Sequence, residues 1–377
     1  MPGKELLNKC MDCKAVDAVL EIRRRSLCKE CYIRFVSYKA FRRTEKYRLR
    51  RDLPKTGPLR LLLPLSYGLS STVLLHMMHA QLEQLTKPHS PPGFDLHVLI
   101  IEPSSISPSC SSRAEAFESL QRLFPLASFT QLPLHCIFDL VPDLQDVLAQ
   151  YAGQDFADDV SRSPRERLDA FRASITTATS VSDVDSILLN RLIVAYAKSI
   201  GCFGVLWGDA DDRLAAKTLA NVAMGRGSSL TWQVSDGMSP FGLEFNFPLR
   251  DLFASELQNY IDLFPELSDI VIPGTPLSDN VLTKNLSIDQ LMRRYVSSQG
   301  AKYPGVMSNV TRTANKLQAS RMSTDGSRCA LCDTIMPSPE RMLNQLRSAS
   351  HQREDSSHHF CYACERSRPD LGPEGTA

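Results

Sequence analysis

The chain has 377 residues, 43% of them hydrophobic and 23% charged, as in a soluble globular protein with one large domain or two medium ones. We expect neither a secretory signal nor a membrane span. Residues 1–14 contain no apolar run, and the uncharged stretch 61–75 is too short and is broken by Pro64 and Gly68. The net charge of +1 is unevenly spread, because residues 1–60 carry 17 Lys and Arg against 7 Asp and Glu.

Short apolar runs alternate with helical patterns along the middle of the chain. In chain order, the predicted strands are residues 59–65, 94–101, 129–138, 203–207, 230–234 and 243–247. The predicted helices are residues 36–55, 71–85, 113–124, 144–151, 164–178, 184–200, 212–224, 252–264 and 288–297. This alternation predicts an α/β fold whose parallel sheet is covered by helices on both faces. From residue 300 onward the chain is polar, and we expect little core there without metal.

Eight of the eleven cysteines form four Cys-x-x-Cys pairs, two near each end of the chain. They are Cys10, Cys13, Cys28, Cys31, Cys329, Cys332, Cys361 and Cys364. Two residues between two thiolates let both sulfurs reach one tetrahedral ion at about 2.3 Å, so each end can form a closed four-sulfur zinc site. Such sites have no open position for substrate, and we expect both to be structural.

These features predict four parts. Residues 1–35 form an N-terminal zinc module, 36–57 a basic helix and linker, 58–325 the α/β domain, and 326–377 a C-terminal zinc module with an insertion and a tail.

The basic arm mixes arginines with aromatic residues, which suits an RNA backbone with bases to stack on. The candidate tRNA-binding residues are Arg23, Arg24, Arg25, Arg42, Arg43, Arg48, Arg50 and Arg51. The alternative is a solvated helix face whose aromatic side chains pack on the core.

The loop of residues 66–72 lies between a predicted strand and a predicted helix, where free backbone amides and the helix dipole favour an anion. Candidate nucleotide-binding residues are Ser66, Gly68, Ser70, Ser71, Asp211 and Asp212. The alternatives are an ordinary turn capped by Ser70 or Ser71, and a cap formed by Asp211 or Asp212 rather than the remnant of a magnesium site.

Three segments resemble motifs of the ATP pyrophosphatase (PP-loop) family. Residues 66–71 resemble its Ser-Gly-Gly-x-Asp-Ser loop, with Tyr67 in place of the first glycine and Ser70 in place of the aspartate. Residues 208–221 resemble its Gly-His-x-x-Asp-Asp…Glu-Thr-x-x-x-Asn segment, with Asp209 for the histidine and Lys217 for the glutamate. Residues 247–251 resemble its Arg-Pro-Leu-Arg-Asp motif, with Phe247 for the first arginine.

With a four-cysteine module at each end, this order of motifs resembles the tRNA 2-thiolation branch, and most closely the cytoplasmic tRNA 2-thiolation protein 2 family, the degenerate subunit of the eukaryotic pair. The resemblance covers nearly the whole chain. It implies a cytoplasmic heterodimer with a catalytic paralogue, cytoplasmic tRNA 2-thiolation protein 1. It also implies tRNAs for Lys, Glu and Gln as substrates for thiolation of the wobble uridine, and a thiocarboxylated ubiquitin-related modifier as sulfur carrier.

The chain departs from the active members of this branch in its remaining cysteines. Those members hold an iron–sulfur cluster or relay sulfur with a Cys-x-x-Cys pair and a distant third cysteine. Here only Cys110, Cys136 and Cys202 remain, far apart in sequence, so we expect no iron–sulfur cluster and no catalytic residue. The changes at Tyr67, Ser70 and Asp209 put binding of ATP and Mg²⁺ in doubt. Two alternatives stay open: an active ATP-dependent tRNA sulfurtransferase, and a zinc-dependent nucleic-acid-binding regulator.

Overall fold

The structure is a computed structural model. It describes residues 9–48, 58–87, 93–106, 114–153, 156–272, 286–317, 327–336 and 359–369. Three predicted residues, Arg50, Arg51 and Cys110, lie outside these ranges, and the side chain of Arg48 is also outside the description.

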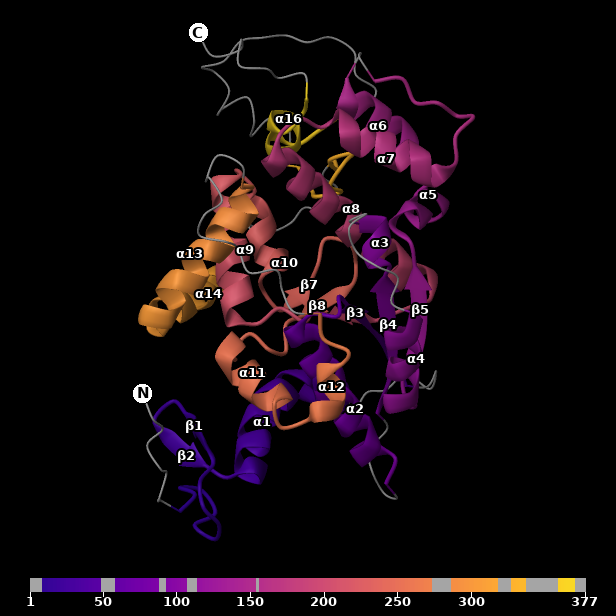
Figure 1. Ribbon diagram of the computed structural model, residues 1–377. Coiled ribbons are helices and arrows are strands. Elements are labelled where there is room, and N and C mark those ends of the chain that lie inside the picture. Colours follow the sequence, from indigo (N-terminus) through magenta and orange to yellow (C-terminus); the bar gives the residue numbers. More distant parts are fainter. Residues whose placement is uncertain are drawn as a thin grey trace.

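A six-stranded sheet forms the centre, with the strand order β5-β4-β3-β6-β8-β7 (Figure 1). Its strands are β3 (Leu59–Leu65), β4 (Phe94–Ile101), β5 (Ser128–Leu132), β6 (Gly204–Leu206), β7 (Gly237–Met238) and β8 (Glu244–Asn246). All neighbours are parallel except β7, which is antiparallel to β8. The predicted parallel α/β sheet is confirmed. Its central strand β3 is rich in leucine because helices cover both of its faces.

The helices near the N-terminal half are α1 (Lys29–Arg48), α2 (Leu69–Leu85), α3 (Pro103–Ile106), α4 (Ala114–Leu123), α5 (Ile137–Leu140), α6 (Leu144–Ala152) and α7 (Pro164–Ser174). Those that follow are α8 (Ala178–Ser199), α9 (Asp211–Ala223), α10 (Leu230–Gln233), α11 (Ala254–Ile261), α12 (Pro265–Ser268), α13 (Ile288–Lys302), α14 (Pro304–Lys316) and α16 (Tyr362–Arg366). No helix in the described ranges has both the length and the apolar character needed to cross a membrane.

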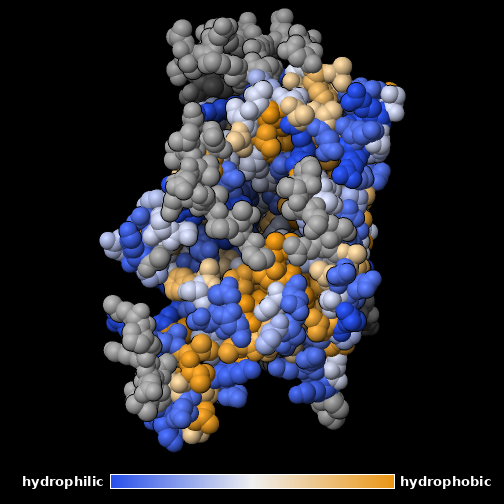
Figure 2. All heavy atoms as spheres, viewed as in Figure 1, coloured by the Kyte–Doolittle hydropathy of each residue, from blue (hydrophilic) through white to orange (hydrophobic). Residues whose placement is uncertain are grey.

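Each face of the sheet has its own hydrophobic core, and each core includes one cysteine module. Leu61, Leu63 and Leu65 of β3 join the core that contains α2, α4, α11 and the N-terminal cysteines. Leu62 joins the core that contains α5 to α8 and the C-terminal cysteines. The two modules consequently lie at opposite ends of the molecule in Figure 1. Figure 2 shows hydrophobic side chains gathered around α11 and α12, whereas mostly polar side chains cover the α13–α14 hairpin.

Several predicted elements differ from the observed ones. The segment 230–234 is helical (α10) rather than a strand, because a short apolar alternation fits either state and the preceding 3₁₀ turn leads directly into a helix. The predicted strand 129–138 ends at Leu132. The polar region after residue 300 contains α14, whose Met307, Thr311 and Ala314 are buried. Helix α1 begins at Lys29 and so runs through the module boundary predicted at residue 35.

Candidate functional site

The N-terminal cysteines form one compact centre. The four sulfur atoms of Cys10, Cys13, Cys28 and Cys31 lie within 4.8 Å of one another, and those of Cys13 and Cys28 are 3.8 Å apart. A tight turn presents the first pair, closed by the amide of Lys14 donating to the carbonyl of Cys10, with Lys14 at φ +56°. The second pair sits at the start of α1. Tetrahedral zinc with bonds of about 2.3 Å requires sulfur separations of about 3.8 Å, so these residues fit a zinc ion.

The C-terminal cysteines repeat this design. The sulfurs of Cys329, Cys332, Cys361 and Cys364 also lie within 4.8 Å of one another, with Cys332 and Cys361 separated by 3.7 Å. Asp333 occupies the place of Lys14, with φ +56° and its amide donating to the carbonyl of Cys329. Cys361 directly precedes α16. Both predicted four-cysteine groups are therefore confirmed as groups compatible with zinc.

Two arginines surround the C-terminal centre. Arg226 lies 3.5 Å from the sulfur of Cys364 and forms an ion pair with Asp183, and both side chains are only 5% exposed. Arg191 donates to the carbonyl groups of Ala330 and Leu331 in the cysteine turn. Because four thiolates around Zn²⁺ leave a net charge of −2, cations at this distance stabilise the loaded centre.

The loop after β3 has the position of a PP-loop. Gly68 is the residue that precedes α2, and Ser70 and Ser71 lie within the helix, so the alternative of a turn capped by one of these two serines is not observed. Instead, the hydroxyl of Ser71 donates to the carbonyl of Gly68, and its oxygen lies 3.2 Å from that of Ser66. The hydroxyls of the loop thus bind one another and the backbone.

Tyr67 occupies this loop in an unusual backbone conformation. Its φ of +57° falls in the left-handed region that favours glycine, yet its side chain is buried at 1% exposure in the core beside α2. The carbonyl of Tyr67 accepts a hydrogen bond from the amide of Ile272 at 2.8 Å. The loop thus keeps the left-handed turn that a glycine would adopt and adds a buried ring to it.

The second motif meets this loop directly. A Cβ placed on Gly208 would lie 2.8 Å from the Cα of Ser71, so only glycine allows this approach. Asp211 is buried and accepts hydrogen bonds from Thr311 at 2.6 Å and Ser308 at 3.0 Å, both on α14. Burial raises the pKa of Asp211 although these hydroxyls oppose the shift. The structure therefore does not use Asp211 as a helix cap.

Asp212 differs from its neighbour. Burial raises the pKa of its carboxyl group, which lies against the first backbone amides of α9, while Ala210 is the residue that precedes the helix. The helix dipole stabilises the carboxylate of Asp212, because this residue lies in the first turn of α9.

The two substituted positions in this motif face each other. Asp209 forms an ion pair with Lys217 at 2.7 Å, and Arg213 lies 3.9 Å away. Burial alone would raise the pKa of Asp209, but Lys217 and Arg213 outweigh it and lower that pKa. An acid and a base have thus exchanged places relative to the histidine and glutamate of the family motif.

The third motif anchors other elements of the chain. Arg250 is buried and donates to Asn315 on α14 at 2.8 Å and to the carbonyl of Val234 at 3.2 Å. Asp251 accepts from Arg43 of α1 at 2.6 Å. The pairs that join Arg250 to α14 and Asp251 to α1 connect residues more than 60 positions apart, which the sequence alone could not pair.

The predicted basic residues fall into two groups. Arg23 forms an ion pair with Glu256 at 2.6 Å, Arg25 forms one with Asp12, and Arg43 forms one with Asp251. In contrast, Arg24 and Arg42 are exposed and form no ion pair with a described residue.

Sequence reasoning missed a third exposed arginine. Arg34 shares one face of α1 with Tyr38, which is 63% exposed, and with Arg42, because the three residues are four positions apart. This regular spacing was the signal that could have identified it. The three residues form what we call the α1 stripe.

The two remaining described cysteines are apart from both centres. Cys202 is buried, and burial raises its pKa to about 11. Cys136 is half-buried in the 3₁₀ turn after β5, and burial raises the pKa of its thiol too.

Comparison with known proteins gives one consistent family. The model of the family described as cytoplasmic tRNA 2-thiolation protein 2 matches residues 287–359. A relative of that name from Emericella nidulans is 71% identical over 87% of this chain and 99% of the relative. Another from Neosartorya fischeri is 60% identical over 98% of this chain and all of the relative, and one from Coccidioides immitis is 43% identical over 96% and 97%. The chain belongs to the cytoplasmic tRNA 2-thiolation protein 2 family. Family membership confirms the cytoplasmic location and the role in tRNA 2-thiolation that the motifs predict.

A solved structure confirms the fold. The U34-tRNA thiolase NcsA from Methanococcus maripaludis aligns with a TM-score of 0.54 and 13% identity over 92% of this chain and 98% of that one. That thiolase carries a 4Fe-4S cluster. The absence of such a cluster here stays a prediction.

Proposed function

We propose that this chain is the non-catalytic subunit of a complex that thiolates the wobble uridine of tRNAs for Lys, Glu and Gln. In this proposal it binds tRNA and supports a catalytic paralogue, cytoplasmic tRNA 2-thiolation protein 1. The paralogue takes sulfur from a thiocarboxylated ubiquitin-related modifier. The observation that carries the proposal is Tyr67, whose ring is built into the core at a position where the PP-loop family has glycine.

The side chains around the loop after β3 support the proposal that this chain is not catalytic. Asp209 is neutralised by Lys217, and both carboxylate oxygens of Asp211 accept hydrogen bonds from hydroxyl groups of α14. Carboxylates that are satisfied within the chain offer little to Mg²⁺, which prefers free oxygen ligands with several waters retained. The loop consequently keeps the shape of a nucleotide site with few groups available to a nucleotide.

The exposed part of α1 supports binding of tRNA. The α1 stripe offers two guanidinium groups with an exposed aromatic ring between them, and Arg24 adds a third cation nearby in sequence. Guanidinium groups bind phosphates and aromatic rings stack on unpaired bases. Arg23 and Arg43, by contrast, hold the arm against the body of the protein.

Thiolation assays of this chain alone, the paralogue alone and the purified pair test the proposal. We expect sulfur transfer only with the paralogue present, and a higher rate with both. Ser66→Ala in this chain should leave the rate of the pair unchanged, because the loop takes no part in chemistry. If this chain alone releases pyrophosphate from ATP and tRNA, and Ser66→Ala stops that release, the chain is itself an active sulfurtransferase.

A binding assay with tRNA at several salt concentrations tests the RNA-binding surface. The double variant Arg34→Glu/Arg42→Glu should weaken binding and lower the slope of log K against log salt by about 0.7–0.9 for each phosphate that the variant no longer neutralises. Arg122→Glu on α4 is the charge-matched control for each of the two single changes, since Arg122 is an exposed arginine on a different helix. Equal binding by all three proteins would mean that α1 does not contact RNA. Binding by none of them, the parent included, would favour a scaffold without RNA contact.

A further inference from the structure

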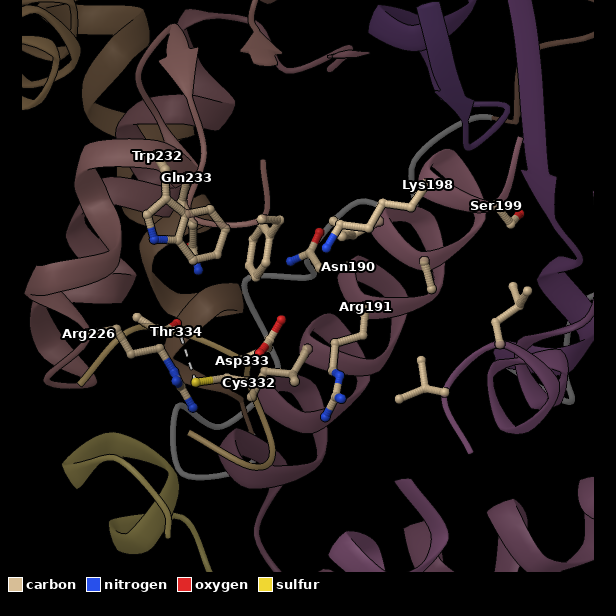
Figure 3. Close-up of a pocket in the computed structure, with 16 residues that line it drawn as sticks. Asn190, Arg191, Lys198, Ser199, Arg226, Trp232, Gln233, Cys332, Asp333 and Thr334 are labelled. Carbon is tan, nitrogen blue, oxygen red and sulfur yellow. Dashed lines mark hydrogen bonds between the residues drawn. The ribbon is translucent and has the colours of Figure 1, made fainter. Parts of the chain in front are cut away.

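A cavity of about 490 Å³ lies between α8, the region around α10 and the C-terminal cysteine turn (Figure 3). Its size falls in the range of about 300–1,000 Å³ that is usual for small-molecule sites. Trp232 and Phe241 form an aromatic wall, with ring centroids 4.9 Å apart. Asn190, Arg191 and Lys198 from α8 form the facing wall.

Four polar side chains of this cavity are not used by the described part of the protein, whereas Arg191, Arg226, Ser199 and Asp333 have partners within the chain. Within the described part of the chain, the side chains of Asn190, Lys198 and Gln233 have no hydrogen-bond partner. The indole nitrogen of Trp232 is buried and also lacks a partner there. Figure 3 draws a single hydrogen bond among the lining residues, between Cys332 and Thr334. Asn190 and Gln233 are half-buried and Lys198 is exposed, so their polar groups remain available to a ligand from solvent. The buried indole N–H of Trp232 is the group that native proteins normally pair, and it indicates a missing partner.

The cavity is separate from the loop that follows β3. Ile200, just beyond Lys198 and the end of α8, accepts a hydrogen bond from Arg60 at the start of β3. Ser66 follows the opposite end of that strand. A strand of this length spans about 20 Å, so the Lys198 side of the cavity and the PP-loop lie at opposite ends of β3.

We propose that this cavity binds a nucleoside 5′-monophosphate, either free or as an unstacked nucleotide of an RNA chain. Trp232 and Phe241 provide the apolar wall for the base, and the amide groups of Asn190 and Gln233 each offer a donor and an acceptor to its edge. Arg191 and Lys198 supply positive charge for one phosphate. Binding of a nucleotide that belongs to an RNA chain rests on the proposed function, whereas binding of a free nucleotide does not.

The proposal is tested by titrating the full chain with UMP, AMP, uridine and inorganic phosphate. Binding is measured by calorimetry and by tryptophan fluorescence. We expect one equivalent of UMP or AMP to bind and to quench fluorescence, and Trp232→Phe to remove the quenching. Lys198→Glu should weaken binding at least about tenfold, as loss of a charge-assisted hydrogen bond does. Lys302→Glu, on the exposed end of α13, is the charge-matched control and should bind as the parent does.

Whether the bound nucleotide belongs to an RNA chain is tested by measuring the affinity of the same variants for tRNA. If free nucleotides do not bind but Lys198→Glu and Gln233→Leu each weaken tRNA binding about tenfold, the ligand is part of the RNA. The proposal is overturned if neither variant changes nucleotide or tRNA affinity beyond twofold, or if inorganic phosphate binds as tightly as UMP. If UMP binds but the parent chain does not bind tRNA, or the α1-stripe variants bind tRNA as tightly as the parent, the tRNA-binding part of the proposed function is refuted and this site stays in place.

Discussion

Tyr67 offers a direct test of whether the PP-loop has become part of the core. Removing its ring by Tyr67→Gly deletes a fully buried aromatic side chain, which usually costs about 3–5 kcal/mol in the free energy of unfolding. The same change relieves a left-handed backbone at φ +57°, which is worth about 1–2 kcal/mol. We therefore expect a net loss of about 2–3 kcal/mol, measured by urea denaturation.

Two further variants separate these contributions. Tyr67→Ala removes the ring but keeps the strained φ, so it should be less stable than Tyr67→Gly by about 1 kcal/mol. Tyr67→Phe keeps the ring and should cost about 1 kcal/mol or less. If Tyr67→Gly matches or exceeds the stability of the parent, the ring contributes nothing to the core and the reasoning about this loop is wrong.

Three other predictions use the same structure. Lys217→Met should destabilise the chain by about 1–3 kcal/mol, because it removes the hydrogen-bonded partner of Asp209 and leaves only Arg213, 3.9 Å away. The double change Asp209→His/Lys217→Glu should recover part of that loss, and equal stability of all forms in denaturation curves would contradict the prediction. Metal analysis should find two zinc ions per chain and one after Cys28→Ser, with loss of about 10 kcal/mol of apparent folding free energy for that module; iron, or no metal, would count against it. Burial lowers the pKa of His76 below its ordinary 6.5, so the unfolded state binds more protons and stability should fall as the pH drops below 6.5. His76→Gln should flatten this decline in pH-dependent unfolding, and an unchanged slope would refute the assignment.

Sequence patterns predicted the structure correctly where a residue type has a single structural role. The bounds of β3 and β4 were predicted correctly because their apolar runs are buried on both faces. Both cysteine centres were predicted because the spacing of the ligands is set by the geometry of the metal.

Other features depend on partners that are distant in the sequence. Helix α14 was missed because its buried face contains Thr311 and Ala314, which carry little hydrophobic signal. The ion pair of Arg43 with Asp251 joins residues 208 positions apart, so its arginine looked available for RNA. Arg34 shows the reverse case: an isolated cation in the sequence lies on an exposed helical face beside Tyr38.

The contacts of the three PP-loop-like motifs explain why the sequence did not predict the roles of their charged residues. Asp209 binds Lys217, Asp211 binds hydroxyl groups of α14, Arg250 binds Asn315, and Asp251 binds Arg43. Each of these charged groups is satisfied by another part of the same chain, and together they tie α1 and α14 to the sheet. A catalytic site keeps such groups unsatisfied for its substrate and loses stability for it. Here the groups stabilise the fold instead, and that explains how the frame of a PP-loop protein can persist after its motif residues have been substituted, as the proposed non-catalytic role requires.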